Sequence, residues 1–166
     1  GTRFLTRGDT KAAFGKDNDF QARYHADAAL HAPIETRTAT AEYKDGGPEL
    51  WMATQAPVAA VEAAAKMLNI AQERVTLYPM LSGGSFDRNL DNAIAGQVAL
   101  MAKEMGRPVQ LVWSRAEELM HDHYRAPSQA RLDAAMAKAG RVTALQSKIA
   151  APPPARAQVQ RPLRGL

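Results

Sequence analysis

The stretch that decides the fold reads Ser82-Gly83-Gly84-Ser85-Phe86-Asp87-Arg88. A strand-like run, Val75–Tyr78, leads into it, and a helix-like run, Leu90–Met105, follows it. Adjacent glycines let a backbone adopt positive φ angles and approach another group closely, and a helix start offers unpaired N–H groups and a favourable dipole. The stretch therefore predicts an anion-binding loop with Phe86 beside the anion. The simpler interpretation is a tight strand-to-helix turn with Phe86 in the core.

Composition limits the classes of function. The chain has 166 residues, 46% hydrophobic and 23% charged, which is an ordinary globular balance. It has no cysteine, which excludes disulfides, thiolate zinc sites and cysteine-ligated iron–sulfur clusters within it. The net charge is only +4 and aromatic residues make up 6%, so we expect no nucleic-acid partner. No stretch is apolar enough to cross a bilayer, and no secretory signal opens the sequence.

Three parts are expected along the chain. Residues 1–19 are polar and are interpreted as an entry linker with a short helical turn at 10–14. Residues 20–150 are expected to form one domain, and residues 151–166 form a tail rich in proline and arginine. The N-terminal glycine and the basic end suggest an excised piece.

Hydrophobic periodicity predicts strands and helices in mixed order. The expected strands are 20–30, 36–44, 49–54, 75–80, 109–113, 129–138 and 142–150, of which 129–138 is also compatible with a helix. The expected helices are 57–69, 90–105 and a short one to about Met120, which the capping box Ser114-Arg115-Ala116-Glu117 opens. Asp45-Gly46-Gly47-Pro48 predicts a hairpin turn. The fold class is α+β, with a mixed or largely antiparallel sheet and two main helices packed on it.

Long apolar side chains define the expected core. In the two main helices they recur at spacings of three and four: Val58, Val61, Ala65, Leu68, then Leu90, Ile94, Val98, Met101, Met105. Asp87 or Asn89 is expected to cap the second helix. Both tryptophans and four methionines are assigned to the core: Trp51, Trp113, Met67, Met80, Met101, Met105.

Single polar motifs each allow two interpretations. Gln55, where a strand meets a helix, is either a hydrogen-bond donor to an anionic ligand or a solvated loop residue. His31 and Glu35 are either a general acid/base pair or exposed polar groups in a loop. His121-Asp122-His123 supplies two imidazoles without a third ligand, so no metal site is assigned. Arg125 is suited to bind an anionic or carbonyl oxygen, or it forms a surface salt bridge.

Five motifs occur in a specific order: His31–Glu35, Trp51–Pro57, Gly83–Arg88, Gly106–Val109 with Trp113–Glu118, and His121–Pro127. Together they resemble the molybdenum-binding large subunit of the xanthine dehydrogenase and aldehyde oxidase family, particularly its isoquinoline 1-oxidoreductase beta-subunit branch. The resemblance covers most of this chain but only a fraction of that subunit. It implies an oxidoreductase that hydroxylates an N-heteroaromatic or aldehyde carbon with oxygen from water.

The resemblance also implies a cofactor, partners and site residues. The cofactor is molybdopterin, often the cytosine dinucleotide in bacteria, and the partners are the rest of the large subunit and a small 2Fe–2S subunit. Gln55 matches the glutamine that hydrogen-bonds a ligand of molybdenum. The cofactor loop comprises Gly83, Gly84, Ser85, Phe86, Asp87 and Arg88. Phe86 borders the substrate, and Arg125 resembles a substrate-orienting arginine.

Some residues differ from the xanthine-type pattern, and these differences change what we expect of the loop and the substrate. Ser85 and Asp87 stand where that loop has glycine; Ser85 suits a negative φ, and Asp87 requires a helix-capping role and neutralisation by Arg88. Leu90 replaces a glutamate, which disfavours purine substrates. Nothing after Ile149 resembles the region of the general-base glutamate, so we assign no catalytic residue here. We expect the isolated chain to be inactive and to bind no cofactor tightly.

Two hypotheses follow. The first is a piece of a molybdenum hydroxylase large subunit, and the second is a stand-alone, non-catalytic binding module with the same fold. The compartment stays open between the cytoplasm and, through a twin-arginine signal, the periplasm.

Overall fold

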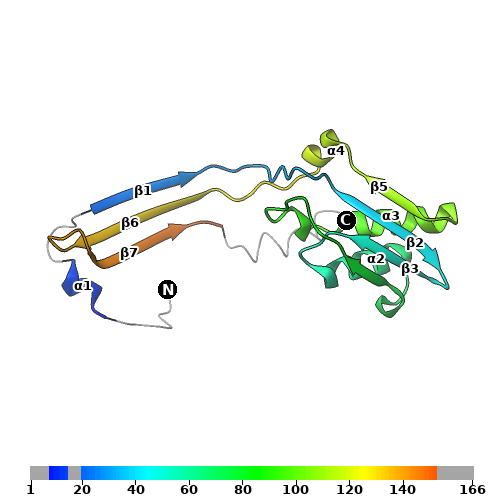
Figure 1. The fold of residues 1–166 in the computed structure, drawn as a ribbon, viewed down its shortest axis with the longest axis horizontal. Helices are drawn as coiled ribbons and strands as arrows, with labels where there is room; N and C mark the ends of the chain where they lie inside the picture. Colours follow the sequence, from blue (N-terminus) through cyan, green and yellow to red (C-terminus); the bar gives the residue numbers. More distant parts are fainter. Residues whose placement is uncertain (1–7, 15–19, 153–166) are drawn as a thin grey trace. The chain divides into compact units, whose positions relative to one another are not determined.

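The computed structural model describes residues 8–14 and 20–152. Within this part the chain forms two compact units, one of residues 8–29 and 126–152 and the other of residues 30–125. Figure 1 shows a sheet in each unit, and each unit is described by itself below.

The first unit is a three-stranded antiparallel sheet in the order β1-β6-β7 (Figure 1). Its strands are β1 (Phe20–Ala26), β6 (Ser128–Met136) and β7 (Val142–Ala150), and α1 (Thr10–Ala13) contacts β7. The expected strand pair is confirmed, and the alanine-rich run is a strand. Gly140, at a φ of 74°, turns the chain between β6 and β7.

One face of this sheet is apolar. The register places Phe20, Ala134 and Leu145 in one cross-strand row. It places Tyr24, Ala130 and Ile149 in another row on the same face.

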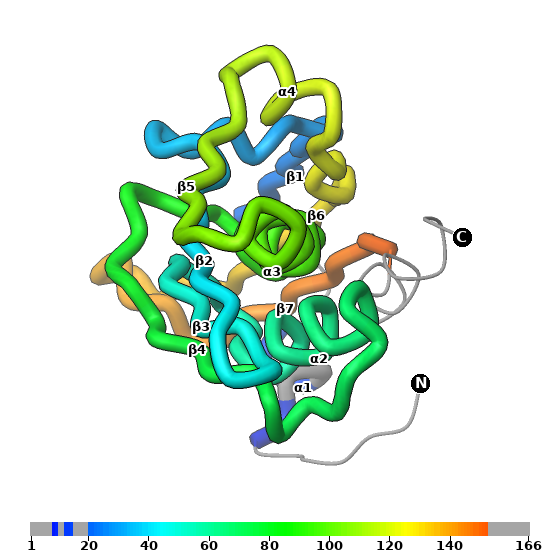
Figure 2. The backbone as a smooth tube through the Cα atoms, turned by 90° about the vertical axis from the view of Figure 1, so that its right-hand side faces the viewer, coloured from blue at the N-terminus to red at the C-terminus, as the bar shows by residue number. Residues whose placement is uncertain are grey.

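The second unit is a four-stranded mixed sheet in the order β4-β3-β2-β5. Its strands are β2 (Thr38–Lys44), β3 (Gly47–Met52), β4 (Thr76–Pro79) and β5 (Val109–Val112). Only the β3–β4 pair is parallel. Its helical segments are α2 (Pro57–Leu68), η1 (Gln72–Arg74), η2 (Arg88–Leu90), α3 (Ala93–Met105) and α4 (Arg115–Met120). The α3 helix packs on β2, β3 and β5 and lies beside α2, as Figure 2 shows, which confirms the predicted α+β fold.

Short sequence features correctly predicted where one turn and two helices begin. Asp45 and Gly46 link β2 to β3 with φ angles of 51° and 81°, the geometry of a type I′ turn. The α2 helix begins at Pro57, where the missing N–H costs nothing. The Ser114 side chain caps α4 by accepting a hydrogen bond from the Glu117 N–H at 3.2 Å.

Alanine makes up much of the core. Four alanines of α2 and α3 are completely buried, at 0% exposure: Ala60, Ala64, Ala95 and Ala99. Such small side chains let the two helix backbones approach closely. A Cβ atom on Gly96 would lie 3.1 Å from the carbonyl oxygen of Ala63.

The predicted core of long side chains was partly wrong. Leu68, Ile94 and Val98 are buried as predicted, whereas other long side chains of the predicted set lie at the margin. Val58 is 67% exposed, and all four methionines are between 39% and 54% exposed: Met67, Met80, Met101, Met105. Trp51 is partly buried and stacks on Tyr78 with ring centroids 5.2 Å apart, whereas Trp113 packs against the core.

The start of α3 also differs from the prediction. The helix begins at Ala93, after a 3₁₀ turn at Arg88–Leu90 that interrupts the helical periodicity. Neither Asp87 nor Asn89 caps it; the Asp91 carboxylate accepts the Ala93 N–H at 3.0 Å. The glycine stretch therefore does not open directly into the helix N-terminus. Among the described residues, no helix has both the length and the apolarity needed to span a bilayer.

The alanine packing gives a first prediction. Ala99→Leu should lower the free energy of unfolding by about 1–3 kcal/mol, because the added carbons have no space between α2, α3 and the sheet. Ala93→Leu, at an exposed position of the same helix, is the matched control. Urea unfolding measures both, and equal midpoints would contradict the close packing.

Candidate functional site

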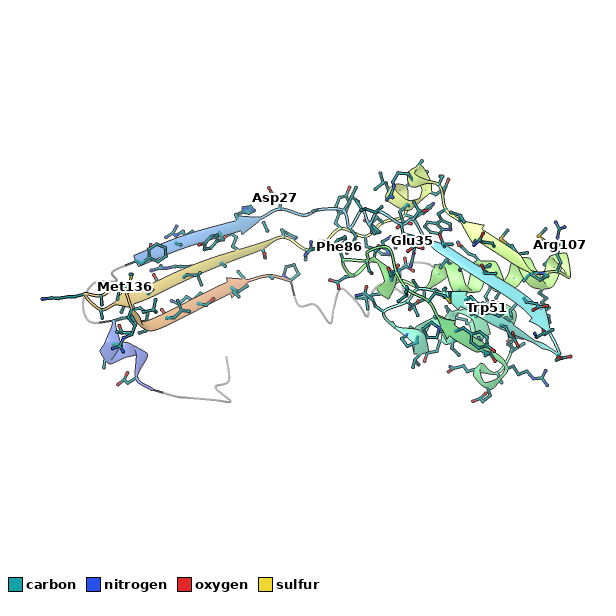
Figure 3. All side chains as sticks on the ribbon, viewed as in Figure 1. Asp27, Glu35, Trp51, Phe86, Arg107 and Met136 are labelled. Carbon is teal, nitrogen blue, oxygen red and sulfur yellow. The ribbon has the colours of Figure 1, made fainter. Side chains whose placement is uncertain are left out.

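A two-point contact holds Gly83 against Glu35. The Glu35 N–H donates to the Gly83 carbonyl at 3.2 Å, and the Gly83 N–H donates to the Glu35 carboxylate. A Cβ atom on residue 83 would lie 2.7 Å from that of Glu35, so the contact requires glycine. Figure 3 shows Glu35 and Phe86 at the same end of the second unit, opposite Arg107.

The loop backbone after Gly83 is unusual. Gly84, Phe86 and Asp87 have φ angles of 100°, 53° and 76°, whereas Ser85 keeps a negative φ, as its side chain requires. Within the described part of the chain, the N–H groups of residues 84–87 have no acceptor. Successive N–H groups in such a turn form a concavity suited to an anion. Phe86 is 61% exposed, so the alternative interpretation that places it in the core is wrong.

Gln55 lies beside this loop. Its backbone N–H donates to the Asn89 carbonyl at 3.0 Å, and its side-chain Oε1 accepts the Ser85 hydroxyl at 2.5 Å. Thr54 fixes the preceding turn through its Oγ1, which donates to Asn92 Oδ1 at 2.8 Å. The structure therefore brings together Gln55 and the glycine loop, which the sequence separates by about thirty residues.

Arg88 is buried beneath the loop, at 1% exposure. Its guanidinium contacts four acceptors: Glu118 Oε1 at 2.6 Å, Asp122 Oδ1 at 3.2 Å, Asp91 Oδ2 at 3.1 Å and the His121 carbonyl at 3.3 Å. It also lies 5.8 Å from the Trp113 ring centroid. The expected neutralisation of Asp87 by Arg88 was wrong, because these partners occupy the guanidinium.

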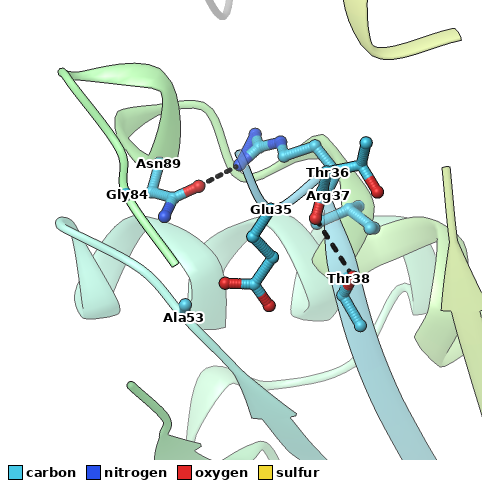
Figure 4. A pocket seen from close by; sticks show the side chains of 8 residues that line it. Glu35, Thr36, Arg37, Thr38, Ala53, Gly84 and Asn89 are labelled. Carbon is cyan, nitrogen blue, oxygen red and sulfur yellow. Dashed lines mark hydrogen bonds between the residues drawn. The ribbon is translucent and has the colours of Figure 1, made fainter. Parts of the chain in front are cut away.

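A second buried arginine, Arg37, completes this cluster. Glu118 bridges the two arginines, since its other oxygen accepts the Arg37 N–H at 2.7 Å. The Arg37 guanidinium donates to Asn89 Oδ1 at 3.4 Å and to the Asp91 carbonyl. Burial lowers the pKa of Arg37 to about 10, so the side chain stays charged at neutral pH. Figure 4 shows Arg37 and Asn89 with Glu35 and Gly84 around a cavity of about 10 Å³, the size of one water molecule.

His31 and Glu35 do not pair with each other. His31 is buried, and its Nδ1 and backbone N–H contact the Asp122 carboxylate at 2.8 and 2.7 Å. Burial alone would raise the pKa of Asp122, but the hydrogen bonds from His31 and the charge on that ring hold this pKa below its ordinary value. The acid/base interpretation and the exposed-loop interpretation were therefore both wrong for His31.

The remaining candidates, His121, His123 and Arg125, follow α4. His121 pairs with Glu117 at 3.2 Å, and His123 lies 3.6 Å from Asp91. Among residues 8–14 and 20–152, no three histidine or carboxylate side chains group as metal ligands. Arg125 is exposed, and no hydrogen bond or ion pair in the described part joins it to the loop.

Comparison with known proteins identifies the family. The sequence profile of the molybdopterin cofactor-binding domain matches residues 2–160. The chain belongs to this family.

Relatives of this molybdopterin cofactor-binding domain are much longer proteins. Isoquinoline 1-oxidoreductase subunit beta of Brevundimonas diminuta is 32% identical over 76% of this chain and 16% of the relative. The membrane-bound aldehyde dehydrogenase (pyrroloquinoline-quinone) of Gluconacetobacter polyoxogenes is 31% identical over 84% of this chain and 18% of the relative. The chain thus spans less than a fifth of either relative.

The fold of the domain occurs in solved structures. The aldehyde oxidoreductase of Desulfovibrio gigas superimposes with a TM-score of 0.62 at 21% identity, over 87% of this chain and 16% of that one. Quinoline 2-oxidoreductase of Pseudomonas putida 86 gives a TM-score of 0.59 at 23% identity, over 86% and 19%. The profile match and the isoquinoline 1-oxidoreductase relative confirm the sequence-based resemblance to this family.

Sequence reasoning missed the residues that hold the cofactor-binding domain's loop in place: Arg37, Asp91 and Glu118. Each contact joins residues far apart in the sequence, and an isolated charge carries no local signal that it will be buried. The sequence has several acidic residues after Trp113, among them Glu118, and these could have indicated a partner for a buried arginine. In this stretch only the helix-capping role of Ser114 was predicted.

The buried arginine gives a second prediction. Arg88→Met should destabilise the chain by about 3–5 kcal/mol, because it leaves buried carboxylates without a partner. Arg74→Met, which removes an exposed arginine, should cost little. Urea unfolding distinguishes them, and a small effect at Arg88 would mean that the cluster is solvated.

The carboxylates of this cluster give a third, pH-dependent prediction. The pKa values of Asp91 and Asp122 lie below the ordinary value of 3.8; burial opposes this, and the neighbouring cations and donors outweigh it. Their contribution to stability is complete above about pH 4 and is lost as pH falls through the lowered pKa values. The urea midpoint should therefore fall steeply below pH 4.

Asp122→Asn tests the origin of that fall. It should lower the midpoint at pH 7 and make the acid dependence shallower. Asp45→Asn, which removes an exposed carboxylate from the hairpin turn, should leave the slope unchanged. An identical slope in both variants would refute the assignment.

Proposed function

We propose that this chain forms part of the cofactor cradle and substrate wall of a molybdenum hydroxylase large subunit. The observation that carries the proposal is the run of four N–H groups at residues 84–87, which have no acceptor among the described residues and lie next to the side chain of Gln55. Membership of the molybdopterin cofactor-binding domain family supports it.

The residues present fit such an anionic cofactor. The donors are backbone N–H groups and one neutral amide, and they need no charged side chain at the contact. Gly84, at a φ of 100°, leaves the backbone open for close approach. When bound, the molybdopterin supplies the two-electron redox chemistry of the hydroxylation. Gln55 and the loop from Gly83 to Asp87 hold the group, and Arg88 fixes the loop from below.

The substrate is a small N-heteroaromatic compound or an aldehyde. The exposed ring of Phe86 offers a flat apolar wall for such a molecule. Arg125 contributes a cation that orients the substrate's polar atom. Leu90 in place of a glutamate makes purines poor substrates.

The complete enzyme requires parts beyond this chain. The cofactor is the cytosine dinucleotide form of molybdopterin, and electrons leave through a small 2Fe–2S subunit. The general-base glutamate comes from the rest of the large subunit. The chain alone is therefore inactive and retains no stoichiometric molybdenum.

Molybdenum content gives a fourth prediction, tested in the polypeptide encoded by the complete reading frame that contains this chain. Gly84→Ala should lower molybdenum per polypeptide severalfold, because a side chain is strained at a φ of 100° and its methyl group would lie against Phe86 and Pro33, which displaces the N–H groups of the loop. Gly106→Ala is the matched control, since it also has a positive φ but lies in open space at the end of α3. Metal analysis measures both after purification from a host that makes the cofactor.

Three outcomes would overturn the proposal. One is equal molybdenum in the two variants, and another is full molybdenum in the isolated chain. The third is a reading frame that ends at Leu166, which would favour the non-catalytic binding module.

A further inference from the structure

We propose that Ser85 is a positioning residue that fixes the side-chain amide of Gln55, with Oε1 held by the loop and Nε2 left free to donate. This inference deepens the proposed function, because it concerns the donor that Gln55 offers to the cofactor. It assigns a role to a serine that stands where the xanthine-type loop has glycine.

The Ser85 hydroxyl has a single proton to donate, and this determines the orientation of the Gln55 side-chain amide. The oxygen accepts the backbone N–H of Asn89 at 3.0 Å, and that residue is buried. The N–H has only this acceptor in the described part of the chain, so the Ser85 oxygen is committed to it. The single hydroxyl proton is then free to donate, and the Gln55 side-chain atom at 2.5 Å must be the acceptor, Oε1.

The opposite amide orientation is unfavourable. A flipped Gln55 would present its Nε2 to the Ser85 oxygen, which would then accept two hydrogen bonds while its own proton lacked a partner. The observed orientation satisfies all three groups. It leaves Nε2 without an acceptor among the described residues.

Asn89 couples this orientation to the loop. Its carbonyl accepts the Gln55 backbone N–H at 3.0 Å, so the same residue fixes the main chain of Gln55 and the hydroxyl of Ser85. Its side-chain amide is oriented in turn, because Oδ1 faces the donor-only guanidinium of Arg37 at 3.4 Å. Nδ2 then donates to Ser82 Oγ at 3.0 Å, and Ser82 donates to the Gly84 carbonyl at 2.6 Å. Every rotatable polar group around Gln55 therefore has a defined direction.

The test uses nuclear magnetic resonance on the ¹⁵N-labelled chain, observing the side-chain NH₂ signals of Gln55. In Ser85→Ala, rotation of the amide about its side-chain torsions should become faster by about fivefold, the factor that corresponds to one hydrogen bond. The heteronuclear NOE of Nε2 should fall with it. Ser85→Gly should give the same result if the alanine variant folds poorly, and Ser85→Thr should restore the wild-type signal. Ser147→Ala, an exposed serine on β7, is the control.

Kinetics of the molybdenum-loaded complete polypeptide provide the second measurement. Ser85→Ala should lower kcat with little change in KM, and Ser85→Thr should recover it. Unchanged Gln55 signals in both the alanine and glycine variants would overturn the inference. Mobile Gln55 signals combined with an unchanged kcat would support the hydrogen-bond assignment and overturn the role proposed for Gln55 at the cofactor.

Discussion

The guanidinium of Arg88 is the interaction on which the second unit depends. It is buried with three carboxylates, and through Glu118 it is joined to the second buried arginine, Arg37. These contacts tie the glycine loop to the end of α4 and to the start of β2. Two arginines and three carboxylates lie together there, so removal of either arginine leaves carboxylates without a partner in a region of low polarity.

The charged side chains hold the loop in place, and a different set of uncharged groups is left unpaired at its surface in the described part of the chain. The charged side chains contact one another, whereas the N–H groups of residues 84–87 and the amide nitrogen of Gln55 have no acceptor among the described residues, and the Phe86 ring is exposed. A neutral donor set of this kind binds an anion through fixed dipoles, which need little reorganisation when the ligand arrives. The charges therefore determine the shape of the site without contributing a cationic contact of their own.

Local signals in the sequence were sufficient for much of the fold. The hairpin at Asp45–Gly46, the proline start of α2 and the Ser114 cap each depend on residues within a few positions of one another. The phase of the alanine-rich helices was not predictable in the same way, because alanine is compatible with either a buried or an exposed face. The start of α3 was misplaced because burial of Arg88 and Asn89 determines the local backbone there.

The sequence was sufficient to predict which segments form the site, but not which of their side chains contact one another. The order of the motifs correctly indicated that Gln55 and the glycine loop belong together. The sequence gave no indication that His31 contacts Asp122 or that Arg37 contacts Glu118, because these pairs are 91 and 81 positions apart. Proximity to Glu35 in the chain allowed an acid/base pair or an exposed loop for His31, whereas the fold places it against Asp122.

The contact between Glu35 and Gly83 restricts how these two positions can change during evolution. The two residues are 48 positions apart, yet each is acceptable only in the presence of the other. A side chain at position 83 would collide with the stem of Glu35, and a shorter acid at position 35 would leave the Gly83 N–H without its acceptor. A substitution at only one of the two positions would break the contact. Descendants of this gene should therefore change both residues together or keep both.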